Sequence, residues 1–263
     1  FKISAVPFHM WTPDVYQGAP TPVTGFFAFA PKIAALALFC RFLFSSFSDS
    51  AHEWQQIIIF LSIASMLFAS FAAIAQNNIK RLMAYSSIGH VGFALIGIAC
   101  FSEEGIQALV IYLIIYLFMN ISVFSFILFM KRKNEYFENI SDLSGLYKHN
   151  PFYAIIISLM MFSLAGIPPL AGFFGKFYIF MAAIKNEMFL LSLVGILASV
   201  ISAFYYLRII KVIYFDQPVD EFDGYSSKSL NILFYPSSFI VIFFFVYPRP
   251  IIEIANFTSK TFF

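Results

Sequence analysis

Four ionisable side chains lie within stretches of sequence that are otherwise apolar: Lys2, Lys32, His90 and Lys176. A charge at the centre of a membrane-spanning helix costs about 2.5–3.5 kcal/mol on insertion scales, so such residues indicate a function by default. Lysine is charged at neutral pH, but burial and a second nearby lysine both disfavour its charged form. Histidine titrates near neutrality and could relay protons between lysines. These four residues therefore predict a proton-transfer site.

Structural roles compete with this interpretation. A single histidine in a membrane is often a hydrogen-bonded packing residue, and His90 alone is explained equally well in that way. Tyr112, Tyr116 and Asn120 are expected to join helices by hydrogen bonds, and Arg41 is expected to extend to the membrane surface. Three lysines at depth favour a function, because two of them lie beside prolines that would interrupt a helix: Lys2 beside Pro7, and Lys176 after Pro168 and Pro169. Because Asp and Glu are absent from the deep part of every apolar stretch, an acidic partner is expected from outside this sequence.

The composition indicates that these residues lie in a protein of the lipid bilayer. Hydrophobic residues make up 60% of the chain and charged residues 11%, with a mean hydropathy of +0.83. Because a soluble domain draws about a quarter of its residues from Asp, Glu, Lys and Arg, we predict an all-α integral membrane protein. The small net charge of +2 gives no indication of a nucleic-acid partner. Cys40 and Cys100 lie in apolar stretches, and neither a disulfide framework nor a metal site is expected from them.

About 20 consecutive apolar residues form a helix that crosses a bilayer. Such stretches occur at 22–45, 55–76, 82–101, 106–130, 152–184, 188–215 and 230–255. Residues 1–8 are predicted to end one further helix, which gives about eight transmembrane helices. Only the connections 131–150 and 216–229 are longer and polar, so residues 1–263 are expected to form one membrane domain.

The charges of the connections predict how the chain is oriented. One set of alternate connections, which contains 9–21, 77–81, 131–150 and 216–229, includes or adjoins Lys80, Arg81, Lys131, Arg132, Lys133, Lys148, Lys211 and Lys228. The opposite set holds Asp49, Glu53, Glu103, Glu104 and Glu187, with Lys185 as its clear base before the C-terminal tail. Positively charged loops face the cytoplasm or an equivalent compartment. We therefore expect these four connections on the cytoplasmic or matrix side and the C-terminus on the other side.

The stretch from Phe152 to Ile184 is too long for one span, since as a helix it would measure about 50 Å against a hydrocarbon core of about 30 Å. Pro168 and Pro169 lie in its middle. Each proline removes a backbone donor and clashes with the preceding turn, so a break is predicted there. Non-helical backbone at membrane depth is tolerated where it is buried in protein or lines a wet cavity, and broken helices mark the transport path of transporters. A kinked helix without a function is the alternative.

Three motifs resemble those of a known family. They are VPFHMWTPDVYQGAPTPV at 6–23, NIKRLMAYSSIGHVGF at 78–93 and SLAGIPPLAGFFGKFYIF at 163–180. Together they resemble the antiporter-like membrane subunits of respiratory complex I, the proton-pumping NADH:quinone oxidoreductase. The first motif is more similar to the subunit N form (the counterpart of mitochondrial subunit 2) than to the subunit L or M forms, and the resemblance spans the whole chain.

The resemblance implies a fourteen-helix fold with two inverted five-helix repeats, each with a broken helix. This chain would then be a fragment that runs from within the seventh helix to the fourteenth. Residues 1–45 would end the first repeat, about 55–215 would form the complete second repeat, and 230–255 would be the final helix. The family's glutamate on the fifth helix would lie outside this sequence.

The resemblance also implies roles for individual residues. Lys2 matches the family's lysine on the broken seventh helix, Lys32 that on the eighth, and Lys176 that on the broken twelfth. These lysines form a proton path along the membrane midplane in the family. The implied activity is that of a translocase subunit without its own cofactor, since NAD, FMN, iron–sulfur clusters and quinone would belong to the whole complex.

The implied partners are other membrane subunits of the complex, the lipid bilayer and protons, with no nucleic acid. The implied location is the bacterial inner membrane, or the mitochondrial inner membrane if the chain is organellar. Two alternatives remain open at this point. The chain could belong to a Na⁺/H⁺ antiporter, which shares the helical repeat, or it could be a scaffold that docks neighbouring subunits without moving protons.

Overall fold

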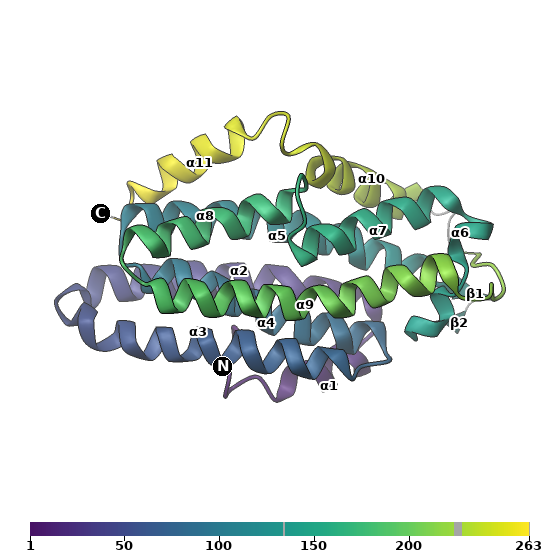
Figure 1. The fold of residues 1–263 in the computed structure, drawn as a ribbon, viewed down its shortest axis with the longest axis horizontal. Helices are drawn as coiled ribbons and strands as arrows, with labels where there is room; N and C mark the ends of the chain where they lie inside the picture. Colours follow the sequence, from purple (N-terminus) through teal and green to yellow (C-terminus); the bar gives the residue numbers. More distant parts are fainter. Residues whose placement is uncertain (134, 224–227, 263) are drawn as a thin grey trace.

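The computed structural model describes residues 1–133, 135–223 and 228–262, and it is an elongated helical bundle whose long helices run side by side (Figure 1). The elements in chain order are α1 (Trp11–Gly18), α2 (Thr21–Ser46), a 3₁₀ turn (Ser48–Ser50), α3 (Ala51–Ile74), α4 (Ile79–Ala99), α5 (Glu103–Phe129), β1 (Lys131–Arg132), β2 (Glu135–Tyr136), a second 3₁₀ turn (Ile140–Leu143), α6 (Leu146–His149), α7 (Pro151–Ala165), α8 (Ala171–Lys185), α9 (Phe189–Phe215), α10 (Lys228–Phe243) and α11 (Arg249–Ser259). The all-α membrane architecture predicted above is confirmed. One short antiparallel pair, between the two-residue strands β1 and β2, was not predicted.

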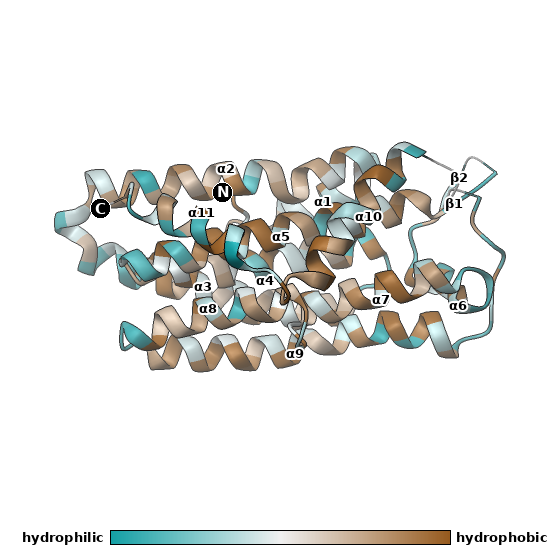
Figure 2. Cartoon of the chain, turned by 90° about the horizontal axis from the view of Figure 1, so that it is seen from above, coloured by the Kyte–Doolittle hydropathy of each residue, from teal (hydrophilic) through white to brown (hydrophobic). Residues whose placement is uncertain are grey.

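Five helices among the described residues are long and apolar enough to cross a membrane: α2, α3, α4, α5 and α9. Helix α4 lies at the centre, because 94% of its most apolar stretch is buried, against 33% in α2. Figure 2 shows the hydrophobic residues along the helices and the hydrophilic residues gathered toward the ends of the bundle. A side chain on α4 is therefore surrounded by protein rather than by lipid.

The predicted break in the 152–184 stretch is confirmed. Helix α7 ends at Ala165, and α8 begins at Ala171 beyond Pro168 and Pro169. Gly166 ends α7 with a φ of +92°, in the left-handed region that favours glycine. The N–H of Ile167 bonds back to the carbonyl of Phe162 at 3.0 Å, a pattern common at helix C-termini. The two halves lie roughly end to end along the bundle (Figure 1).

Two predicted helical segments differ from the structure. Residues 1–8 were expected to end a helix, but the structure has turns rather than a helix before α1. Pro7 lies among these turns, and it has no N–H to donate to a helical hydrogen bond. The stretch 230–255 was expected to be one helix, but it is two, α10 and α11. Pro248 and Pro250 lie at the start of α11, where the fixed φ of proline suits a first helical turn but not the interior of a helix. Both α10 and α11 pack against α5.

The basic connections come together at one end of the bundle, as their charges predict. Glu138 of the 131–150 connection pairs with Lys80, and Asn150 donates to Glu221 of the 216–229 connection at 2.6 Å. The C-terminal residues lie at the opposite end, where Arg41 donates to the carbonyl of Thr261 at 3.0 Å. Figure 1 shows β1, β2 and α6 at one end and the C-terminus at the other.

Candidate functional site

His90 lies in the middle of α4 and is joined to two other helices. Its Nδ1 is 2.5 Å from the hydroxyl of Tyr112 on α5, and its Nε2 is 3.3 Å from the hydroxyl of Tyr206 on α9. The Tyr206 hydroxyl is also 2.5 Å from that of Ser86. His90 is 4% exposed, so three helices enclose the imidazole in a network of neutral hydroxyl groups.

Small residues on α4 let α3 pack closely beside it, which helps to bury His90. A Cβ atom at Gly92 would lie 2.7 Å from Cγ and 2.9 Å from the backbone nitrogen of Met66 on α3. The hydroxyl of Ser62 donates to the carbonyl of Gly92 at 2.7 Å. Close packing through small residues is a common way for membrane helices to associate, and here it brings α3 against α4 and closes one side of the site.

Lys32 lies on α2 and points toward α4. Its ammonium group donates to Ser87, whose hydroxyl also accepts from Tyr116 at 2.9 Å. The Lys32 side chain is 1% exposed, and its Nζ lies 5.4 Å from the centroid of the Tyr16 ring of α1. A lysine at this position is therefore held by one hydroxyl group and one aromatic face, with protein on every side.

The preceding residue connects Lys32 to Tyr16 in a second way. Pro31 lies inside α2 and has no N–H for the carbonyl of Phe27, one turn earlier. The hydroxyl of Tyr16 donates to that carbonyl at 3.1 Å. Tyr16 therefore satisfies the carbonyl that Pro31 leaves free and at the same time faces the ammonium of Lys32.

Lys176 lies on α8, next to the break. Its Nζ donates to the carbonyls of Leu164 and Ala165 at 3.0 and 2.8 Å and to the hydroxyl of Ser199 on α9 at 2.8 Å. These carbonyls belong to the last turn of α7, which has no intrahelical donors. A Cβ atom at Gly166 would lie 3.2 Å from Nζ, so glycine at this position leaves room for the lysine.

Lys32 and His90 lie in one polar region, and Lys176 lies beyond Phe93 on the other side of His90. The Tyr116 ring lies 5.0 Å from the His90 ring, between His90 and the Ser87–Lys32 contact. A cavity of about 10 Å³ lies between Lys32 and His90, about the smallest that holds one water molecule. On the other side Phe93 separates His90 from Lys176, at 6.2 Å from the His90 ring and 5.0 Å from the lysine Nζ.

Lys2 is not part of this region. Its side chain is exposed at the surface of the bundle, in a groove with a volume of about 450 Å³ that it shares with Ala5, Leu38 and Leu61. The structure therefore brings together Lys32, His90 and Lys176, but not the fourth residue that the sequence singled out.

Sequence reasoning assigned Tyr112 and Tyr116 a structural role only, and it did not single out Ser87, Ser199 or Tyr206 as residues of the site. Tyr112 and Tyr116 were expected to act as interhelical hydrogen bonders, and they do so through His90 and Ser87 themselves. Their spacing of four residues, which places both on one face of α5, was the available signal. Ser87, Ser199 and Tyr206 are among common membrane-helix residue types and carry no such signal.

The chemistry of the region is that of proton donors and acceptors. Lysine, histidine, tyrosine and serine side chains can each carry or pass a proton. Among the described residues there is no group of three or more His, Cys, Asp or Glu residues that could hold a metal ion.

Comparisons with known proteins identify the relatives of this chain. The family described as NADH:quinone oxidoreductase/Mrp antiporter, transmembrane, matches residues 1–202. The NADH-quinone oxidoreductase subunit N of Parvibaculum lavamentivorans is 58% identical over 252 residues, which cover 96% of this chain and 52% of that protein. The protein of the same name from Rhodospirillum rubrum is 55% identical over 253 residues, covering 96% of this chain and 52% of that protein. The chain thus spans about half the length of the curated relatives that it matches.

Solved structures show the same fold. A chain of respiratory complex I from Thermus thermophilus with bound aureothin has a TM-score of 0.82 and 30% identity, covering 96% of this chain and 55% of that one. A chain of the Mrp complex from Dietzia sp. has a TM-score of 0.84 at 18% identity, covering 99% and 57%, and shares the fold alone. With a family match over residues 1–202 and an antiporter-like fold, the chain belongs to the NADH:quinone oxidoreductase/Mrp antiporter transmembrane family.

Proposed function

We propose that this chain is part of a membrane subunit that translocates protons through Lys32, His90 and Lys176. The observation that carries the proposal is the arrangement of two buried lysines on either side of a buried histidine in an apolar bundle, with Tyr116 between His90 and Lys32 and Phe93 between His90 and Lys176. Buried ionisable groups are expensive in a membrane and mark ion pathways. Because each lysine is held by neutral hydroxyl or carbonyl groups rather than by a carboxylate, neither is locked in its charged form.

We further propose that the protein works within an NADH:quinone oxidoreductase, where electron transfer in other subunits drives the proton transfer. The relatives that carry this name are 58% and 55% identical to the chain. Among the solved structures, the complex I chain is 30% identical and the Mrp chain is 18% identical. The NAD, FMN, iron–sulfur and quinone sites would lie elsewhere in the complex, and the other membrane subunits would be the partners. The bacterial relatives favour the inner membrane as the location.

The repeat boundaries stay predictions. Residues 1–45 would end the first repeat, about 55–215 would form the second, and 230–255 would form the final, interrupted helix. Lys2 would act with residues of the first repeat that lie outside this sequence.

The test replaces Lys32 and Lys176 singly by alanine in the full-length protein within its complex. Each variant is expected to lower the number of protons pumped per electron while the complex still assembles. The measurement is proton uptake by vesicles during NADH oxidation. Wild-type stoichiometry in both variants would contradict proton translocation by these lysines and favour a scaffold. Sodium-dependent transport in the absence of a quinone would favour an antiporter subunit.

A further inference from the structure

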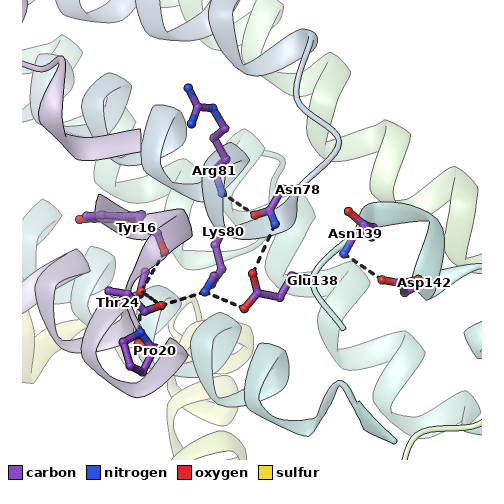
Figure 3. Close-up of polar contacts among 10 residues, drawn as sticks. Tyr16, Pro20, Thr24, Asn78, Lys80, Arg81, Glu138, Asn139 and Asp142 are labelled. Atoms are coloured by element: carbon purple, nitrogen blue, oxygen red, sulfur yellow. Dashed lines mark hydrogen bonds and ion pairs between the residues drawn. The ribbon is translucent and has the colours of Figure 1, made fainter. Parts of the chain in front are cut away.

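Lys80 is a buried lysine whose ion-pair partner, Glu138, is 25% exposed, at the end of the bundle where the basic connections meet. Its Nζ lies 2.6 Å from Glu138 and donates to the carbonyl of Ala19 at 2.9 Å. Figure 3 shows Lys80 between Glu138 and the chain that follows α1. The Lys80 side chain is 2% exposed, whereas the basic partners of the other ion pairs between described residues are 30%, 62% and 75% exposed. This position makes Lys80 different from an ordinary charged residue at a helix end.

Glu138 is held in place from several directions. Its second carboxylate oxygen accepts from the side chain of Asn78 at 3.3 Å, and its carbonyl accepts from the N–H of Ile79 at 2.7 Å. Asn78 also caps α4 through the N–H of Arg81 at 3.0 Å. The carboxylate is therefore fixed relative to the first turn of α4, and it places a negative charge beside the buried ammonium of Lys80.

The other partner of Lys80 leads to the proton-transfer region. Ala19 directly follows α1, and Tyr16 lies one turn earlier on that helix. The hydroxyl of Thr24 on α2 donates to the carbonyl of Tyr16 at 2.9 Å. Tyr16 is fully buried, and its ring faces the ammonium of Lys32 at 5.4 Å. A displacement of the end of α1 would therefore move the aromatic face that Lys32 contacts.

We propose that Lys80 and Glu138 are positioning residues for the proton-transfer region: Glu138 holds the ammonium of Lys80, which donates to the carbonyl of Ala19 and so keeps the end of α1 against α4 and Tyr16 against Lys32. The inference rests on the proposed function. Arg81 also joins α4 to α1, through Asp14 at 2.6 Å, but the Asp14 side chain is 74% exposed. An exposed pair of this kind contributes little, and Arg81 also donates to the side chain of Gln17 at 3.1 Å in an exposed contact. Lys80 therefore provides the buried polar contact between α4 and the end of α1.

A direct role of Lys80 in carrying protons is the competing explanation, and arginine separates the two. Arginine keeps the positive charge and has donors for both the carboxylate and the carbonyl, but it does not release its proton in proteins. A positioning residue is therefore rescued by arginine, and a proton carrier is not.

The experiment uses the full-length protein in its assembled complex, in vesicles that oxidise NADH. The variants are Lys80→Met, Lys80→Arg and Glu138→Gln, with Lys211→Met as the matched control, because Lys211 forms an exposed ion pair with Asp216. Lys80→Met and Glu138→Gln are each expected to lose most of the protons pumped per electron and to displace the pH profile of pumping. The double variant should be no worse than Lys80→Met alone, because both residues act through one contact. Lys80→Arg and Lys211→Met should pump as the wild type does.

Two results would overturn the inference: normal pumping by Lys80→Met, or a Lys80→Arg variant as defective as Lys80→Met. If Lys80→Met does not assemble, Glu138→Gln decides, because it keeps the shape of the side chain, and an unchanged pH profile and stoichiometry in that variant would overturn the inference as well. Lys32→Ala in the same vesicles separates this result from the proposed function. Normal pumping by Lys32→Ala contradicts the function itself, whereas a defect in Lys32→Ala without one in Lys80→Met contradicts only the positioning role.

Discussion

Lys176 donates to the carbonyl of Ala165 at 2.8 Å and thereby satisfies a backbone acceptor at the break between α7 and α8. The break leaves the last carbonyls of α7 without intrahelical donors, and the lysine supplies hydrogen bonds to two of them, those of Leu164 and Ala165. Loss of a proton from Lys176 would weaken these bonds, because an ammonium group donates more strongly than a neutral amine. The protonation of the lysine and the geometry of the break are therefore coupled.

Gly166→Ala should disturb this arrangement without removing a charge. The φ of +92° at Gly166 is unfavourable for alanine, at a cost of about 1–3 kcal/mol, and the new Cβ would lie 3.0 Å from Cδ of Lys176. We expect a lower melting temperature of the detergent-solubilised complex and lower pumping per electron. Gly172→Ala does not serve as a control, because its Cβ would overlap the carbonyl oxygen of Ser163 at 1.8 Å. An unchanged melting temperature would show that the break tolerates a side chain here.

Ser199→Ala should reveal how much the hydrogen bond from Lys176 to α9 contributes to proton pumping. The hydroxyl accepts from Nζ at 2.8 Å, and hydrogen bonds between membrane helices contribute about 0.6 kcal/mol on average. We expect normal assembly and a measurable but partial decrease of pumping, since the two carbonyl contacts remain. A loss as complete as that of Lys176→Ala would mean that the serine itself passes the proton.

Tyr112→Phe and Tyr206→Phe should differ in their effects, because their distances to His90 differ. The Tyr112 hydroxyl is 2.5 Å from Nδ1, and the Tyr206 hydroxyl is 3.3 Å from Nε2. If His90 relays protons by way of Tyr112, Tyr112→Phe should slow pumping more than Tyr206→Phe does at equal complex content. Proton uptake in vesicles, normalised to NADH oxidation, measures both. Equal rates in the two variants would indicate a packing role for His90.

Gly92→Ala should destabilise the contact between α3 and α4. The added Cβ would lie 2.9 Å from the backbone nitrogen of Met66, and overpacking of a close contact costs about 1–3 kcal/mol. Gly89→Ala is the matched control on the same helix, because its Cβ would meet only the Cβ of Ala69, at 3.6 Å. We expect Gly92→Ala to lower the melting temperature and the yield of the complex, and Gly89→Ala to leave both unchanged. Equal stability of the two variants would show that α3 can move aside.

Much of the architecture followed from the sequence for simple physical reasons. A bilayer of fixed thickness makes an apolar stretch of about 20 residues a span, and the paired prolines at 168–169 favour a break over a kink in a stretch that is too long for one span. The prediction of one helix over 230–255 was wrong because the apolar run continues across Pro248 and Pro250, which start a new helix instead. Lys32, His90 and Lys176 were identifiable because ionisable residues are rare in such an environment.

What only the tertiary structure decided was which side chains meet. Surfaces that face lipid and surfaces that face protein are both apolar here, so the sequence pattern does not tell which face of a helix contacts which neighbour. The aromatic face beside Lys32 comes from α1, the hydroxyl beside Lys176 comes from α9, and Glu138 reaches Lys80 from a distant connection. Within the residues of this sequence Lys2 is exposed, although its residue type and setting in the sequence resemble those of the two buried lysines. Sequence identified the rare charges in an apolar chain, and the packing of the helices determined their partners.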